Sequence, residues 1–451
     1  MKKIRKNSLI LLACALLLVS CNENENLAEE QKPTCTMHYD LNHDGKCDNC
    51  GTGGLTVNHI DVNKDGYCDT CHANMPLPPF KIQNKLNGAD YNLNNTRIQE
   101  YMSCQDTSEG YKQMAALFAE YKNKTQIKTN NPLTLSWNDE TNSSPYTIQF
   151  SLKENFDEIL YEESGLIESS FVVDNFIPGK YYYRIKNSAD RFSDTDSFNL
   201  SNQVRMISGL SNTRDMGGWK IGNNKRIKYG LVYRGGEIFA NCDDIYSTLN
   251  IKSDIDLRKS STVAITSPAP SIDNYIYAGL SAFDIMIPQD NPVKEQIHNQ
   301  YGDLLQYNSY SEASVNGLKN GLLAYADTST MPSLVHCTGG ADRTGTFCFI
   351  LESLLGVSYE DACRDYELTT ICIGGMRVRS DYDSNGFTDL GFVPQSKSSV
   401  YCALGIFYKE ILYYGNEGDS LQVCMENYVK QVVGLTDANI QAIRNNLIEN
   451  I

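Results

Sequence analysis

Short segments between residues 130 and 204 alternate apolar and polar side chains. The segments 132–137 and 146–152 show this pattern clearly. A period of two residues is typical of a β-strand with one buried face. Two further segments, 171–173 and 176–185, are rich in aromatic and β-branched residues and are bounded by turn residues. Several short strands joined by turns predict a small all-β sandwich over 130–204.

The pattern changes near residue 205, where apolar runs of strand length alternate with segments of helical periodicity. In the segment 312–326, for example, Val315, Leu318 and Leu322 share one helical face. Strands are expected at 231–233, 251–257, 275–278 and 333–336, and helices at 293–306, 312–326, 344–355, 399–413, 421–433 and from about Thr436 onward. This alternation predicts an α/β domain over 205–451, with a mainly parallel central sheet flanked by helices.

The region before the sandwich gives weaker signals. Three prolines, Pro76, Pro78 and Pro79, stiffen the chain, and residues 109–122 follow a helical pattern. We therefore expect a linker and a partly helical segment over 76–129. Within the sandwich, the strand around Trp137 and the segment 178–184 resemble a fibronectin type III or immunoglobulin-like module, which implies that their aromatic side chains belong to its core.

The first 21 residues have the pattern of an export signal. Basic residues at the start precede an apolar stretch over 9–19, which is too short to span a bilayer as a mature helix. The stretch ends in Leu18-Val19-Ser20-Cys21, which resembles the lipobox of bacterial lipoproteins. The resemblance implies a signal peptide over 1–21, lipidation of Cys21 and attachment to the cell envelope, on its periplasmic or its outer face. An ordinary secretory signal is the alternative, and 22–32 is expected to be a solvated tether.

Composition and charge narrow the possible partners. The chain has 451 residues, of which 41% are hydrophobic, and this is enough for packed domains. Its formal net charge of −16 argues against binding to nucleic acid, since no basic stripe is present to neutralise phosphates. It also argues against unspecific binding to anionic lipid, so membrane contact is expected only through the lipid anchor. An anionic substrate would need a local positive site.

Residues 33–75 contain two copies of one motif, spaced 21 residues apart. The pattern Asp-x-Asn-x-Asp-Gly places oxygen ligands as calcium loops do, but the acidic residue expected at the loop end is missing. The spacing of Cys and His fits a structural zinc site, and a metal-free spacer pinned by disulfides is the alternative. The candidate ligands are Cys35, His38, Asp40, Asn42, Asp44, Cys47 and Cys50 in the first copy, and His59, Asp61, Asn63, Asp65, Cys68 and Cys71 in the second. The repeat therefore predicts a structural zinc or calcium site.

The segment 333–345 carries the strongest chemical signal in the chain. An apolar strand ends at His336, Cys337 follows, and Arg343 lies six positions further on, before an apolar helix. The glycines Gly339 and Gly340 allow the backbone to curl so that its N–H groups face an anion, and the helix N-terminus faces the same point. Such a field stabilises a thiolate. The segment predicts a nucleophilic Cys337 beside an oxyanion-binding loop.

This segment resembles the signature loop of protein tyrosine and dual-specificity phosphatases, and most closely that of the bacterial atypical tyrosine phosphatases. The segments 212–218, 233–236, 254–258 and 365–369 resemble other blocks of that family. The resemblance implies catalysis by Cys337 and Arg343, substrate binding by Thr338, Gly339, Gly340, Ala341 and Thr344, and support from His336, Arg214 and Asp215. It also implies a cysteinyl-phosphate intermediate and no cofactor for catalysis. The substrate is expected to be a phosphorylated protein or a small phosphate ester.

Two points within this motif leave alternatives open. The family has a lysine where Ala341 stands, and members with that lysine often accept phosphoinositides, so this departure bears on the substrate. The loop residue Asp342 is the general acid that the resemblance implies, while Asp284 or Asp290 would serve if the acid came from a separate loop. Arg214 and Asp215 could form a structural ion pair under the loop or contact substrate.

Two other readings of the function compete with a protein tyrosine phosphatase. One is a binding or adhesion lipoprotein with a vestigial phosphatase fold, and the other is a phosphoinositide or inositol phosphate phosphatase. Sulfur transfer or arsenate reduction would need a resolving thiol, and Cys348 on the following helix is poorly placed for that role. The intact Cys337, Asp342 and Arg343 favour a working phosphatase.

Overall fold

The computed structural model describes scattered residues between 40 and 69, and residues 79–451 except 122, 125–126, 260–265, 282–310, 376, 380–381, 384–385 and 388–402. The chain divides into two compact units, 1–78 and 79–451. In the first unit, Lys46 and Gly53 form an isolated antiparallel bridge, and Cys47 and Cys68 are buried. No helix in the described part of the chain is long and apolar enough to cross a membrane.

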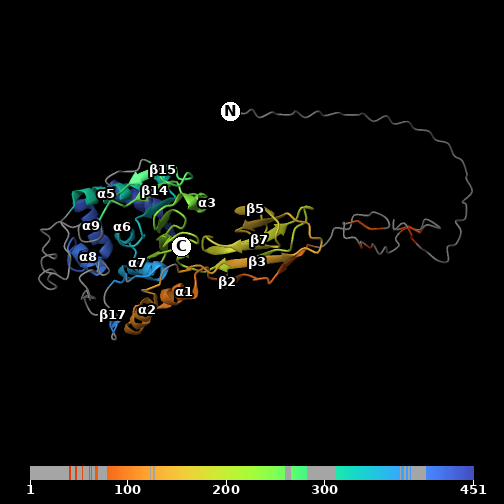
Figure 1. Ribbon diagram of the computed structural model, residues 1–451, viewed down its shortest axis with the longest axis horizontal. Coiled ribbons are helices and arrows are strands. Elements are labelled where there is room, and N and C mark those ends of the chain that lie inside the picture. The colour runs from red at the N-terminus through yellow and green to blue at the C-terminus, as the bar shows by residue number, and fades with distance from the viewer. Residues whose placement is uncertain are drawn as a thin grey trace, which may run out of the picture. The chain divides into compact units, whose positions relative to one another are not determined.

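The second unit begins with two β-sheets that share one hydrophobic core (Figure 1). The smaller sheet has the order β1 (Lys81–Gln83), β3 (Leu133–Asn138) and β6 (Ser170–Val173). The larger has the order β2 (Ala89–Tyr91), β8 (Asp196–Leu200), β7 (Gly179–Lys186), β4 (Tyr146–Ser151) and β5 (Tyr161–Leu166). Alternate side chains of β3 and β7 point inward, and Trp137, Phe150 and Tyr183 fill the core.

The boundary of this β-region differs from the expectation. The sequence predicted strands from residue 130 onward, whereas β1 and β2 come from the segment that was expected to be a linker. Both strands have only three residues, and Ile82 is the one buried side chain of β1. Strands of this length carry too little alternation to be recognised in the sequence.

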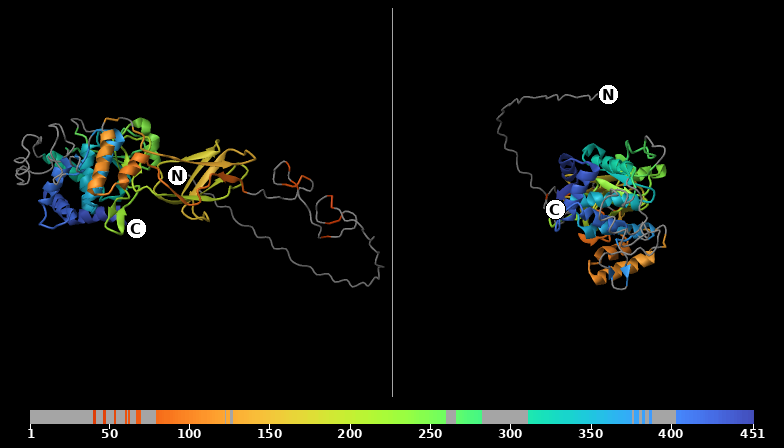
Figure 2. Two further views of the ribbon diagram at one scale, coloured as in Figure 1. Left: turned by 90° about the horizontal axis from the view of Figure 1, so that it is seen from below. Right: turned by 90° about the vertical axis from the view of Figure 1, so that its left-hand side faces the viewer.

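The helices α1 (Thr96–Ser103) and α2 (Ser108–Tyr121) follow, and α2 agrees with the helix expected over 109–122. The side chain of Asn95 caps α1 by accepting a hydrogen bond from the N–H of Ile98. Their buried side chains, including Met114 and Phe118, join the core of the C-terminal α/β region rather than that of the β-region. In Figures 1 and 2 both helices, drawn in orange, accordingly lie beside α7 (Tyr359–Ile373).

The C-terminal region is built on a six-stranded mixed sheet, which confirms the α/β character expected from the sequence. Its order is β15 (Asn274–Tyr277), β14 (Ser253–Asp256), β16 (Ser333–His336), β13 (Val232–Gly235), β10 (Arg214–Asp215) and β9 (Arg205–Met206). The first four strands are parallel to one another. Strand β10 runs antiparallel to β13, and β9 runs antiparallel to β10. The carboxyl ends of the parallel strands therefore lie along one edge of the sheet.

Helices pack around this sheet. They are α3 (Asp243–Thr248), α5 (Glu312–Ala324), α6 (Asp342–Leu355), α7, α8 (Ala403–Leu412), α9 (Leu421–Tyr428), which continues as a π-helical turn over Val429–Val433, and α10 (Asp437–Leu447). Almost every residue of α6 is buried, so this helix is the centre of the core. The helix expected at 293–306 lies outside the described residues. At the end of the chain, β19 (Ile448–Asn450) pairs with β12 (Lys225–Ile227), which also pairs with β11 (Lys220–Ile221).

Candidate active site

Cys337 lies at the carboxyl end of β16, directly before a loop that leads into α6. The strand is flanked on both sides by parallel strands, so the loop emerges at the edge of the sheet where ligands bind in α/β folds. The helix α6 begins at Asp342, and the backbone N–H groups of its first turn have no acceptor within the helix. The site therefore combines a thiol with the positive end of a buried helix.

The loop is held by hydrogen bonds to its backbone carbonyl groups. A peptide C=O points away from the N–H of the same peptide plane, so carbonyl groups bound from outside leave the N–H groups facing inward. The carbonyl of Cys337 accepts a hydrogen bond from His336 Nδ1 at 3.0 Å, and the carbonyl of Thr338 accepts one from the N–H of Glu237 at 3.1 Å. The carbonyl of Gly339 accepts one from Asn212 Nδ2 at 2.9 Å, and the carbonyl of Gly340 accepts one from Arg234 Nη2 at 2.8 Å. Four successive carbonyl groups are bound in this way, which makes the loop an anion-binding cradle.

The two glycines of the loop have different importance. Gly340 has φ of +66°, and a Cβ atom there would lie 2.5 Å from the carbonyl carbon of Gly235. Gly339 has no such constraint, since the nearest atom to a Cβ would be Ile373 Cδ1 at 3.9 Å. Close packing of the loop against β13 thus requires glycine at 340 and not at 339.

A buried charge cluster supports the cradle from behind. Asp365 on α7 accepts from Arg214 Nε at 2.7 Å and pairs with Arg234 Nη1. Burial alone would raise the pKa of Asp365, but the two guanidinium groups lower it below its usual value. Arg214 also donates to Asn212 Oδ1 at 3.0 Å. Asp365 therefore anchors Arg234 directly and Asn212 through Arg214, and these two side chains bind the carbonyl groups of Gly340 and Gly339.

The ion pair between Arg214 and Asp215 that was considered from the sequence does not form. Neighbouring residues of β10 point to opposite faces of the sheet, so the two side chains separate. Asp215 instead binds Arg205 Nη1 at 2.9 Å and accepts from the N–H groups of Gly217 and Gly230. Arg214 therefore supports the cradle, while Asp215 holds the turn that follows its own strand.

The environment of Cys337 favours the thiolate. Burial alone would raise its pKa, but hydrogen bonds from the hydroxyl and N–H groups of Thr344, the charge of Arg343 and the N–H of Gly340 lower the pKa below its usual value. The Thr344 hydroxyl has no other hydrogen-bond partner among the described residues, so its proton remains available to the sulfur. The predicted roles of Cys337 and Thr344 fit this geometry.

His336 is buried behind the nucleophile. Its Nδ1 must donate to the carbonyl of Cys337, because a carbonyl oxygen can only accept, and its Nε2 lies 2.9 Å from Asp254 Oδ1. Burial alone would lower the pKa of His336, but the hydrogen bond and charge of Asp254, together with the charge of Asp256, raise the pKa. A protonated imidazole here adds a positive charge next to the cradle.

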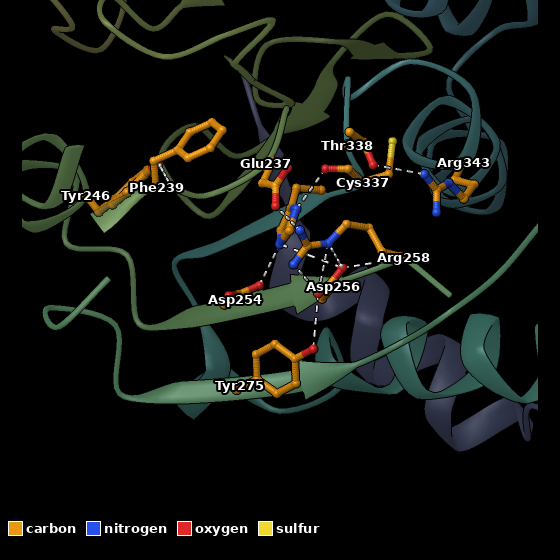
Figure 3. Close-up of polar contacts among 11 residues, drawn as sticks. Glu237, Phe239, Tyr246, Asp254, Asp256, Arg258, Tyr275, Cys337, Thr338 and Arg343 are labelled. Atoms are coloured by element: carbon orange, nitrogen blue, oxygen red, sulfur yellow. Dashed lines mark hydrogen bonds and ion pairs between the residues drawn. The ribbon is translucent and has the colours of Figure 1, made fainter. Parts of the chain in front are cut away.

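Arg343 and Thr338 lie at the open side of the loop (Figure 3). Arg343 Nη2 donates to Thr338 Oγ1 at 3.2 Å. Thr338 is exposed and Arg343 is half-buried, and a guanidinium group at this position can bind two oxygens of an anion. Ala341 is buried and precedes the first turn of α6, which places no charge at the position of the family's lysine.

Asp342, the acid implied by the family resemblance, forms a two-point contact with an arginine that the sequence did not single out. Arg377 Nη2 lies 3.2 Å from Asp342 Oδ2, and Arg377 Nε donates to Oδ1 at 3.3 Å. The alternative acids, Asp284 and Asp290, lie outside the described residues. Of the three candidate acids, Asp342 is therefore the one that the structure describes.

A second polar network borders the cradle. The guanidinium of Arg258 forks onto both oxygens of Asp256 and also pairs with Glu237, while the Tyr275 hydroxyl donates to Asp256 at 3.1 Å (Figure 3). Because Arg258 is shared between two carboxylates, its charge is already neutralised. This network fixes Glu237, whose N–H binds the carbonyl of Thr338.

The residues of the predicted metal site are mostly outside the described part of the chain. Only Asp40, Cys47 and Cys68 are described, and the described residues contain no group of three or more His, Cys, Asp or Glu side chains placed to hold a metal. Cys35, His38, Asn42, Asp44, Cys50, His59, Asp61, Asn63, Asp65 and Cys71 are not described, and neither is Cys21. The zinc or calcium site therefore stays a prediction.

The loop can bind an anion next to the thiol of Cys337, and comparison with known proteins shows the class of the protein. Residues 206–449 match the model of the tyrosine phosphatase family. The chain belongs to that family, whose members hydrolyse phosphate esters without a metal or cofactor in catalysis. This agrees with the phosphatase class expected from the sequence.

A relative from Cupriavidus necator carries the name "Putative tyrosine-protein phosphatase". It is 26% identical to this chain over 170 residues, which make up 35% of this chain and 59% of that protein. The chain thus matches less than two thirds of the relative's length. The N-terminal segment and the β-region lie before the part that matches the family.

Proposed function

We propose that this protein is a cysteine-dependent phosphomonoesterase that removes phosphate from phosphotyrosine in proteins. The observation that carries the proposal is the set of four loop carbonyl groups, Cys337 to Gly340, that are all bound from outside the cradle. The inward N–H groups, the α6 N-terminus and Arg343 then provide fixed positive charge for three phosphoryl oxygens.

In the first step, the Cys337 thiolate attacks phosphorus in line with the ester bond. A sulfur–phosphorus bond forms, the phosphorus–oxygen bond to the leaving group breaks, and Asp342 donates a proton to the leaving oxygen. Charge on the phosphoryl oxygens is stabilised by the cradle and by Arg343 throughout. The product of this step is a cysteinyl-phosphate and a free alcohol or phenol.

In the second step, the carboxylate of Asp342 accepts a proton from water, the water oxygen bonds to phosphorus, and the sulfur–phosphorus bond breaks. Phosphate leaves, and the thiolate of Cys337 is restored with hydrogen bonds from Thr344. A stable thiolate is a better leaving group, so the features that lower the pKa of Cys337 favour this step as well as the first. His336 and Asp254 act from behind the loop by holding its backbone.

The location of the protein is part of the proposal. The basic start, the apolar stretch over 9–19 and the Leu-Val-Ser-Cys sequence at 18–21 support a lipoprotein anchored through Cys21 in the cell envelope. The tether and the motif repeat over 33–75 would then separate the catalytic unit from the membrane. Substrates would be phosphorylated proteins or small phosphate esters that reach this compartment.

The experiment is phosphate release by the chain lacking residues 1–21, under reducing conditions and without added metal. The panel contains phosphotyrosine, phosphoserine and phosphothreonine peptides, phosphoinositides and inositol phosphates. We expect fastest release from phosphotyrosine, complete loss in Cys337→Ser, and no loss in Cys242→Ser, a matched change at a half-exposed free thiol. Fastest release from phosphoinositides would overturn the substrate, and no release by folded protein would favour the binding lipoprotein.

A further inference from the structure

The contact between Arg377 and Asp342 joins two parts of the site that lie 35 residues apart in the chain. Nε and Nη2 of the guanidinium each contact one oxygen of the carboxylate, at 3.3 and 3.2 Å. A two-point contact of this kind fixes the plane of the carboxylate as well as its position. Asp342 is the first residue of α6, and Arg343 is the second.

The backbone at Arg377 is itself fixed against α7. Its N–H donates to Thr370 Oγ1 at 2.9 Å, and the same hydroxyl donates to the carbonyl of Arg377 at 3.0 Å. The segment leaves α7 through Gly374 and Gly375, which both have positive φ. This geometry turns the chain back toward the N-terminus of α6.

The residue two positions further on anchors the same segment a second time. Arg379 is buried, its N–H donates to Glu367 Oε1 at 2.8 Å, and its Nη2 lies 2.8 Å from Glu367 Oε2. Glu367 also accepts from the Tyr101 hydroxyl of α1 at 2.6 Å, and Arg379 Nη1 lies 3.6 Å from Asp106. The segment that carries Arg377 is thus held between α7 and the connection of α1 to α2.

We propose that Arg377 is a positioning residue that orients the carboxyl group of Asp342 toward the leaving oxygen. The inference rests on the proposed function, in which Asp342 donates the proton. The guanidinium contacts both carboxylate oxygens of Asp342, so its effect on the reaction would pass through Asp342. Arg377 places a positive charge beside Asp342 at the start of α6. Residue 341, where the family has a lysine, is an alanine and carries no charge.

A purely structural role would have different consequences. The side chains of Arg377 and Asp342 are 17% and 30% exposed, and an ion pair that solvent reaches contributes little to folding. Loss of Arg377 should therefore leave the protein folded. A positioning role instead affects the step in which the leaving oxygen needs a proton.

The leaving group separates these roles. p-Nitrophenolate departs readily without a proton, whereas an alkyl oxygen needs the acid. We expect Arg377→Gln to lower kcat for an alkyl phosphate about tenfold or more, and kcat for p-nitrophenyl phosphate less than about threefold. Arg377→Lys should recover only part of the loss, since an ammonium group cannot make the two-point contact.

A double-mutant cycle with Asp342→Asn then tests whether Arg377 acts through Asp342. On the alkyl phosphate, the double variant should be no slower than Asp342→Asn alone. Arg226→Gln is the matched control, because it breaks a half-exposed ion pair with Glu449 on β19, and its activity should equal that of the unaltered protein.

Three results would overturn the inference. They are equal losses on both substrates, losses that add in the double variant, and a change in KM alone, which would mean that Arg377 binds the phosphoryl group directly. Failure of the unaltered protein to hydrolyse p-nitrophenyl phosphate would instead overturn the proposed function, so the two failures are distinguishable.

Discussion

Arg234 Nη2 donates a 2.8 Å hydrogen bond to the carbonyl oxygen of Gly340, while Nη1 of the same guanidinium pairs with Asp365. The shape of the cradle is therefore tied to a fully buried charge cluster, which Asp365 of α7 forms with Arg214 of β10 and Arg234 of β13. Such a cluster is costly to disrupt, because removal of one partner leaves a buried charge unpaired. This coupling keeps the loop preorganised before an anion binds.

The two loop glycines provide the first test of the cradle. Gly340→Ala should lower kcat/KM at least about a hundredfold, because a Cβ 2.5 Å from Gly235 must displace the loop. Gly339→Ala is the matched control and should lose less than about tenfold, since its Cβ meets no atom closer than 3.9 Å. Steady-state kinetics on p-nitrophenyl phosphate measure both. Equal losses would contradict the assigned packing of the loop.

The hydroxyl of Thr344 provides a test of thiolate stabilisation. Thr344→Val removes a hydrogen bond that lowers the pKa of Cys337, so the pKa should rise. Iodoacetamide inactivation followed against pH should then have its midpoint at higher pH, with slower alkylation at pH 6. Thr346→Val, two residues further along α6, removes a hydroxyl bound to the carbonyl of Asp342 and should leave the midpoint unchanged. An unchanged midpoint in Thr344→Val would show that its hydroxyl does not bind the sulfur.

The buried Glu352 makes stability depend on pH. Burial raises its pKa well above the usual value, and the charge of Asp365 raises it further; neither oxygen has a hydrogen-bond partner among the described residues. The folded protein therefore holds a proton that the unfolded chain releases near pH 4.3. The stabilisation from this proton is complete below that pH and is lost as pH rises toward the folded pKa.

Glu352→Gln should remove this dependence. In urea unfolding, the variant should be more stable than the unaltered protein at pH 8, and the difference should shrink toward pH 4. Glu417→Gln, at an exposed position, is the control and should show no such trend. A Glu352→Gln variant that is equally destabilised at every pH would mean that the carboxyl group is needed for packing and not merely tolerated.

The helices α1 and α2 should be necessary for the catalytic domain to fold. Ile98, Met114 and Phe118 are fully buried in its core, and Arg364 donates to the carbonyls of Tyr101 and Cys104. Loss of one large apolar core residue costs about 2–5 kcal/mol, so loss of all three is comparable to the whole stability of an ordinary domain. A fragment of residues 206–451 should aggregate or lack a cooperative thermal transition by circular dichroism, whereas 79–451 should unfold cooperatively. A stable 206–451 fragment would contradict this.

The part of the candidate site that is continuous in the chain could be predicted from the sequence. The strand that ends at His336, Cys337 and the helix that carries Thr344 lie within one short segment, and the structure has the strand and the helix where the pattern predicted them. Asn212, Arg234 and Asp365 stood in segments that resemble the family, yet the contacts of Asn212 and Arg234 with the loop carbonyls, and of Asp365 with Arg234, depend on the tertiary fold. The sequence alone gave no signal for those contacts.

Other features left no usable pattern. Arg377 meets Asp342 only because two glycines after α7 turn the chain back. The helix α7 was not predicted, since its buried face includes charged and polar residues such as Arg364 and Glu367, which hide helical periodicity. The short strands β1 and β2 were expected to be part of a linker, because three residues are too few to show a periodicity.

The most direct test of the account is to trap the covalent intermediate. The chain lacking residues 1–21 is mixed with p-nitrophenyl phosphate, quenched within one turnover, digested and measured by mass spectrometry. The account predicts one phosphoryl group on the peptide that contains Cys337, which decays as phosphate is released and is absent in Cys337→Ser. Phosphate release by Cys337→Ser at the unaltered rate, or a phosphoryl group on another residue, would contradict it.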